Sequence, residues 1–186
     1  MKILPLYFKL GLALLVCCSI QSAKAQSICD SLQEAAIYDT NAKRYHYYEV
    51  TTDLIGLDDP IAISKKDIFL RMISQRGFVA PVSKKPELPL IHGEPFDVKI
   101  AFLNRNPVIA CIDSSRFTVI NYALKGHFLY PGYVKRQVIE NGGKYAIQTT
   151  SEGLGRFPKM DEKKASNIWE SQDQKILNAL INDKGL

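Results

Sequence analysis

The sequence predicts an α+β protein, in which an antiparallel sheet of about five strands is packed by N-terminal, middle and C-terminal helices. Two observations lead to this fold class. Short segments rich in β-branched and aromatic residues follow one another between residues 96 and 149. Apolar residues recur at helical spacing before and after this region. The helices therefore lie outside a run of antiparallel strands.

Three helices are expected from apolar spacing and from end signals. Ile28, Leu32 and Ala36 share one face of a first helix near residues 28–38. Ser64 and Asp67 have the spacing of a capping box, which begins a helix over about residues 65–76 that Gly77 ends.

The C-terminal helix is expected over about residues 163–182. Its apolar face contains Ala165, Ile168, Trp169, Ile176, Leu177 and Leu180. Trp169 is the largest of these side chains, and we expect it to pack on the sheet.

Five segments have the composition of strands, and they are residues 96–102, 108–112, 117–122, 134–139 and 144–149. Residues 104–107 join the first two segments. Asn141-Gly142-Gly143 joins the last two as a hairpin turn supplied by glycine. Earlier in the chain, Tyr45-His46-Tyr47-Tyr48 favours ordinary strand packing over the stacking of a base or sugar.

Residues 1–25 have the three-part layout of a secretory signal peptide. Lys2 precedes an apolar run from Leu10 to Ile20, and small residues at Ala23 and Ala25 predict cleavage before Gln26. The run is shorter than the roughly 20 residues that cross a bilayer, so cleavage is favoured over an uncleaved anchor. Lipidation at Cys17 or Cys18 is the less favoured alternative. We therefore expect a periplasmic or secreted protein with a single domain over residues 26–186 and no membrane attachment after cleavage.

The charge balance favours solvated surfaces over a basic surface that binds nucleic acid. The chain has 24 Lys and Arg against 19 Asp and Glu. Lys2, Lys9 and Lys24 leave with the signal peptide, so the mature chain has a net charge of only +2. The remaining basic pairs alternate with acids, which is typical of solvated surfaces. No nucleic-acid partner is indicated, and no spacing indicates a metal site or a cofactor.

Cys29 and Cys111 are the only cysteines of the mature chain. An oxidising compartment permits them to pair, and secreted chains seldom keep two free thiols. The alternative is a buried thiol at Cys111 and an unpaired Cys29 on the first helix. We predict the disulfide, which would close a long loop and stabilise the fold by about 4 kcal/mol in the chain-entropy model.

The C-terminal half resembles a known domain. The segment Gly126–Arg136 has a His before a Pro-Gly turn and an Arg after it. A Gly-Gly hairpin, the loop Ser151-Glu152-Gly153-Leu154-Gly155 and a late Asn167-Ile168-Trp169 follow. Over roughly residues 120–180 this pattern resembles a domain found at the C-termini of Rhs- and VgrG-type polymorphic toxins and in some exported bacterial proteins. Ser151 and Leu154 depart from its glycine-rich loop, which has glycine and threonine at those positions.

The same loops contain the candidate site residues, because loops presented by a rigid sheet commonly carry function. His127 and Glu152 are candidates for a general base and its orienting carboxylate, and Arg136 is a candidate for stabilising an anion. Tyr130 and Ser151 are candidate binding residues. The alternative is structural, with His127 and Tyr130 in a turn, Glu152 solvated and Arg136 on the outward side of a strand.

Two functions follow as hypotheses. The first is a secreted toxin-like effector that uses His127, Arg136 and Glu152 on an unidentified small substrate. The second is a periplasmic binding or immunity-type protein that blocks a protein partner without catalysis.

Overall fold

The computed structural model describes residues 23–56, 63–80, 85–98, 106–155 and 158–185. Its centre is one sheet with strand order β1-β6-β5-β4-β3-β2, in which all neighbours are antiparallel. The predicted α+β class is confirmed, with six strands rather than about five. The bounds of the strands are β1 His46–Gly56, β2 Pro95–Asp97, β3 Pro107–Asp113, β4 Thr118–Ala123, β5 Gly132–Asn141 and β6 Lys144–Gly153.

The additional strand is β1, which contains most of the Tyr45–Tyr48 aromatic cluster. It pairs with β6 from His46 opposite Gly153 to Gly56 opposite Lys144, so the first and last strands of the chain are neighbours. At the other edge, β2 is formed by Pro95–Asp97 and covers the start of the expected strand at residues 96–102. Residues 99–102 of that strand lie outside the described part of the chain.

The described part of the chain also contains the helices α2 Lys65–Ser74, α3 Arg76–Val79 and α4 Pro158–Asp183. The capping box of Ser64 and Asp67 is confirmed at the start of α2. The expected stop at Gly77 is wrong, because α2 ends at Ser74 and Gln75 is extended. Gly77 instead lies within α3, where a Cβ atom would come within 2.8 Å of Pro86 Cβ.

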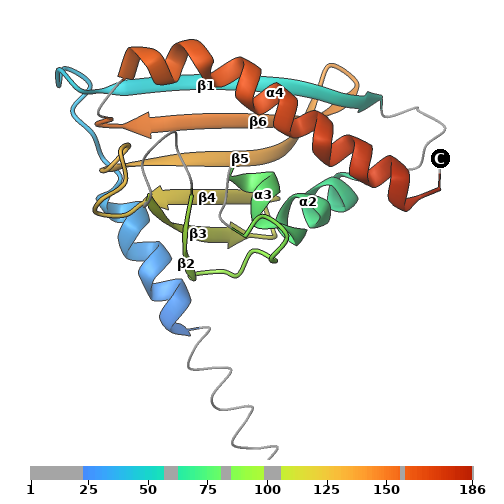
Figure 1. Ribbon diagram of the computed structural model, residues 1–186, viewed down its shortest axis with the longest axis horizontal. Helices are drawn as coiled ribbons and strands as arrows, with labels where there is room; N and C mark the ends of the chain where they lie inside the picture. The colour runs from blue at the N-terminus through green and yellow to red at the C-terminus, as the bar shows by residue number, and fades with distance from the viewer. Residues whose placement is uncertain (1–22, 57–62, 81–84, 99–105, 156–157, 186) are drawn as a thin grey trace, which may run out of the picture.

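All three helices lie on one side of the sheet, where α4 crosses β1 and β6 and α2 and α3 cover the strands below (Figure 1). We call this the inner face. The main apolar core lies between this face and the helices, and Ile68, Phe69 and Met72 of α2 and Ile176 of α4 belong to it. The strands contribute Val108, Ala110, Val119, Val138 and Ile147 to the same core.

The buried face of α4 differs from the expected one. Trp169 is buried as expected, but Ile168 is 44% exposed. Gln172 and Asp173 are buried in its place, although both are polar. Each has a hydrogen-bonding partner across the core, which makes their burial tolerable.

Three consecutive carbonyls of α3 are bound by side chains from other elements. Gln172 donates to Gly77 O, Arg136 donates to Phe78 O, and Asn121 donates to Val79 O at 2.9 Å. A four-residue helix satisfies few of its own carbonyls, so these side chains complete its hydrogen bonding. They also join α3 to α4, β5 and β4.

The opposite, outer face of the sheet carries the N-terminal helical segment, residues 23–35. This segment begins earlier and ends earlier than the predicted helix at residues 28–38. The predicted disulfide is confirmed: Cys29 of the segment is bonded to Cys111 of β3, and Ile109 and Tyr122 pack around it.

Most of the predicted signal peptide, residues 1–22, lies outside the described part. No helix in the described ranges has the length and apolar character to cross a membrane.

Candidate functional site

The register of the β5–β6 hairpin separates two of the predicted catalytic residues. Arg136 pairs with Thr149 across the hairpin, and both side chains belong to the inner face. Glu152 is three residues beyond Thr149. Because side chains alternate between the faces of a strand, Glu152 lies on the outer face.

Arg136 is completely buried beneath α4. Its guanidinium donates to Asp173, to Phe78 O and to Thr149 Oγ1, and it lies 4.9 Å from the centre of the Trp169 ring. Burial lowers the pKa of Arg136 to about 9, so the group stays charged at neutral pH. Its charge is neutralised by Asp173 inside the core, which leaves it no access to a substrate.

His127 lies in the turn region between β4 and β5 and is 7% exposed. Its Nδ1 accepts from the Leu129 N–H at 3.0 Å, and its ring stacks on Phe128. Burial lowers the pKa of His127 to about 4. The imidazole is therefore neutral at pH 7 and holds the turn together.

The two predicted binding residues differ in exposure. Tyr130 is 44% exposed and precedes Pro131 through a cis peptide bond. Ser151 is fully buried on the inner face. Its hydroxyl donates to Tyr133 O at 2.9 Å and lies 3.2 Å from Nε2 of the buried His46.

Glu152 lies among tyrosines on the outer face. Tyr133 donates to its Oε2 at 2.9 Å, and Tyr45 donates to its Oε1 at 3.2 Å. Among the described side chains, His127, Arg136 and Glu152 share no hydrogen bond or ion pair with one another. The described partners of the two groups differ: His127 accepts from the Leu129 N–H, and Glu152 accepts from two tyrosines.

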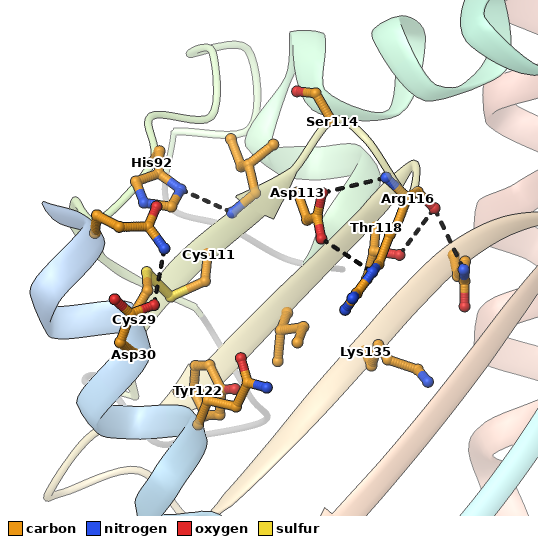
Figure 2. A pocket seen from close by; sticks show the side chains of 15 residues that line it. Cys29, Asp30, His92, Cys111, Asp113, Ser114, Arg116, Thr118, Tyr122 and Lys135 are labelled. Carbon is orange, nitrogen blue, oxygen red and sulfur yellow. Dashed lines mark hydrogen bonds and ion pairs between the residues drawn. A yellow bond between two sulfur atoms is a disulfide. The ribbon is translucent and has the colours of Figure 1, made fainter. Parts of the chain in front are cut away.

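A cavity of about 580 Å³ lies on the outer face, between the N-terminal helical segment and strands β3, β4 and β5. Figure 2 shows the disulfide of Cys29 and Cys111 on one side of it, with Asp30 on the helix, Lys135 on β5 and Arg116 in the turn between β3 and β4. The volume is in the range of small-ligand sites in proteins.

Several polar groups of this cavity have unused hydrogen-bonding capacity. His92 Nδ1 accepts from the Ile112 N–H at 3.0 Å, so the neutral ring carries its proton on Nε2. That Nε2 is buried and has no hydrogen-bond partner within the described chain. Lys135 likewise has no ion-pair partner there, whereas Arg116 pairs with Asp113 at 3.7 Å. The cavity therefore holds the His92 N–H donor and the Lys135 ammonium beside the carboxylates of Asp30 and Asp113.

Within the described ranges, no group of three or more His, Cys, Asp or Glu side chains is placed to hold a metal ion. The sequence analysis did not identify His92, Lys135 or Arg116 as site residues. Alternation within β5 places Lys135 on the face opposite Arg136, but the position of the N-terminal helix over that face depends on long-range packing. No local sequence signal marks the cavity.

No family model matches the sequence, and no curated protein matches it. Solved structures share the fold. Protein MLL2253 from Mesorhizobium loti matches with a TM-score of 0.52 and 9% identity, over 76% of this chain and 100% of that chain. Protein XoxI from Bacillus cereus matches with a TM-score of 0.51 and 9% identity, over 75% and 98%.

The di-domain aromatase/cyclase StfQ from the steffimycin biosynthetic pathway matches with a TM-score of 0.52 and 8% identity. The match covers 90% of this chain and 61% of that chain. These similarities define a fold that the chain shares with the three structures. At such low identity they show the fold alone.

Proposed function

We propose that this chain is an exported binding protein that acts without catalysis through the outer face of its sheet. The observation that carries this proposal is the cavity beneath the N-terminal helical segment, with its buried, unpartnered His92 N–H donor and its Lys135 ammonium. A buried donor without a partner is costly, and a ligand acceptor would satisfy it. We infer a ligand or partner segment that carries carboxylate or other acceptor groups.

The environments of the predicted catalytic residues support a binding role over an enzymatic one. Arg136 is neutralised by Asp173, His127 has a pKa of about 4, and both oxygens of Glu152 accept from tyrosines. A general base works best with a pKa near the operating pH, which is far above that of His127.

Titration with succinate, a small ligand with acceptors at both ends, tests the cavity. We expect saturable shifts of the backbone amide signals of Ile112, Ile120 and Lys135 in two-dimensional NMR spectra. Lys135→Ala should weaken binding about tenfold, because a charge-assisted hydrogen bond contributes roughly 1.5–3 kcal/mol. Lys144→Ala is the matched control, since Lys144 pairs with Asp53 outside the cavity. Shifts confined to other elements, or unchanged by Lys135→Ala, would contradict the site.

Export is part of the proposal, and it is supported by the leader pattern and by the disulfide, which is typical of oxidising compartments. We expect the protein recovered from the periplasm or medium to begin at Gln26, with or without cyclisation of that residue. Intact mass spectrometry checks this. A product that retains Met1, or one with lipid on Cys17, would exclude the processing proposed here.

The toxin-like effector that the resemblance implies is the alternative proposal. A periplasmic toxin should arrest growth when exported and spare cells when the signal peptide is deleted. The binding protein should be harmless in both forms. If the exported chain is toxic and either His127→Ala or Glu152→Gln removes toxicity while the thermal melt is unchanged, the non-catalytic proposal fails.

A further inference from the structure

Glu152 is the centre of a tyrosine cluster on the outer face, formed with Tyr38, Tyr45 and Tyr133. Each oxygen of its carboxylate accepts one hydrogen bond, from Tyr45 or from Tyr133. The ring of Tyr38 lies 6.3 Å from that of Tyr133, at an angle of 33°. All four side chains are partly exposed, so the cluster is open to solvent.

Within the described chain, no Lys or Arg side chain forms an ion pair with Glu152, the carboxylate of this cluster. Burial and the nearby Glu152 carboxylate raise the pKa of Tyr38 to about 12. Burial and the hydrogen bond to Glu152 also raise the pKa of Tyr133. The tyrosines therefore stay protonated at neutral pH, and they add no negative charge to that of the carboxylate.

We propose that Glu152, together with the rings of Tyr38, Tyr45 and Tyr133, binds an organic ammonium cation. A cation over a tyrosine face is attracted by the negative face of the ring, and a carboxylate at the same site adds a full opposite charge. A metal ion fits less well, since calcium needs six to eight oxygen ligands and the cluster has one carboxylate whose oxygens already accept hydrogen bonds.

This inference deepens the proposed function and rests on it in one respect, the use of the outer face for binding. Tyr122 lines the cavity and its ring is 6.0 Å from that of Tyr133, so the cluster borders the cavity. The cavity supplies the His92 N–H donor and the Lys135 ammonium, whereas the cluster supplies a carboxylate and aromatic rings. A ligand that carries an ammonium group and an acceptor group could use both.

The ammonium group has two sources, a small free amine or a lysine side chain of a protein partner. Tetramethylammonium chloride represents the first, and N-acetyl-lysine methylamide represents the second. Both can be titrated into mature protein with ring-labelled tyrosine, against sodium chloride at equal ionic strength. We expect saturable shifts in the ring signals of Tyr38, Tyr45 and Tyr133. Tighter binding of one probe would identify the source.

The decisive variant is Glu152→Gln, which keeps the side-chain shape and removes its charge. It should weaken binding about tenfold, the effect of losing roughly 1.4 kcal/mol. Glu49→Gln is the matched control, because Glu49 also lies on the outer side of β1 and accepts from a single tyrosine, Tyr47, at 3.2 Å. That control should bind as the wild type does.

A second variant, Tyr38→Leu, removes a ring without touching the carboxylate, and it should also weaken binding. Thermal melts confirm that each variant is folded. The proposal is overturned if wild-type protein shows no saturable shift with either probe, or if Glu152→Gln binds as tightly as the wild type. Because succinate reports on the cavity and ammonium on the cluster, the two sites can fail independently.

Discussion

Replacing Arg136 with methionine is expected to lower the free energy of unfolding by about 3–5 kcal/mol, which is typical when one partner of a buried ion pair is removed. The substitution leaves Asp173 charged and fully buried without its cation. It also removes the donors to Phe78 O and Thr149 Oγ1. α3 would therefore lose one of its three side-chain connections to the core.

Urea denaturation monitored by circular dichroism measures this loss. Arg116→Met is the matched control, because its side chain is 76% exposed and pairs with Asp113 on the surface. Such pairs contribute roughly 0–1 kcal/mol, so the control should be nearly neutral. The double variant Arg136→Met/Asp173→Leu should recover part of the loss, because no charge then remains buried. A loss below about 1 kcal/mol for Arg136→Met would show that the pair does not stabilise the core.

Local signals in the sequence were sufficient to predict several elements of the fold. The capping box begins α2 because Ser64 and Asp67 satisfy each other's backbone N–H groups. The β5–β6 hairpin forms because Gly142 and Gly143 adopt positive φ angles of 54° and 77°, which other residues seldom adopt. Both features depend on a few neighbouring residues, so a single sequence reveals them.

Features that depend on distant packing were missed. β1 pairs with β6, which lies about a hundred residues later in the sequence, and the composition of β1 does not indicate which strand it pairs with. The burial of Asp173 on α4 was also missed, because apolar spacing selects Ile168 and Leu177 instead. Only the position of Arg136 on the facing strand explains why a carboxylate is buried there.

The separation of Arg136 from Glu152 follows from the hairpin that the sequence predicts. With a two-residue turn at Gly142-Gly143, Arg136 pairs with Thr149, and Glu152 must then lie on the other face. Proximity of loops along the sequence suggested a shared site, but strand alternation excludes one for these two residues. Alternation also places Lys135 and Glu152 on the same outer face, where both proposed binding groups lie.

The disulfide has the second large expected effect. Cys111→Ser should lower the free energy of unfolding by about 4 kcal/mol in the chain-entropy model, because the bond closes a loop over a sequence separation of 82. For a chain of this size the melting temperature would fall by roughly 2–4 °C for each kcal/mol. Thermal melts of oxidised wild type and variant measure the difference.

The variants also separate the effect of the bond from the effect of either side chain. Cys29→Ser, Cys111→Ser and the double variant should be destabilised equally, since each removes the same bond. Free-thiol labelling of denatured, unreduced wild type should find no thiol, and two titratable thiols would contradict the disulfide. Because the bond holds the N-terminal helical segment over the outer face, the three variants should also bind succinate more weakly than the wild type. Unchanged succinate binding in a variant without the bond would mean that the helical segment is not needed to form the cavity.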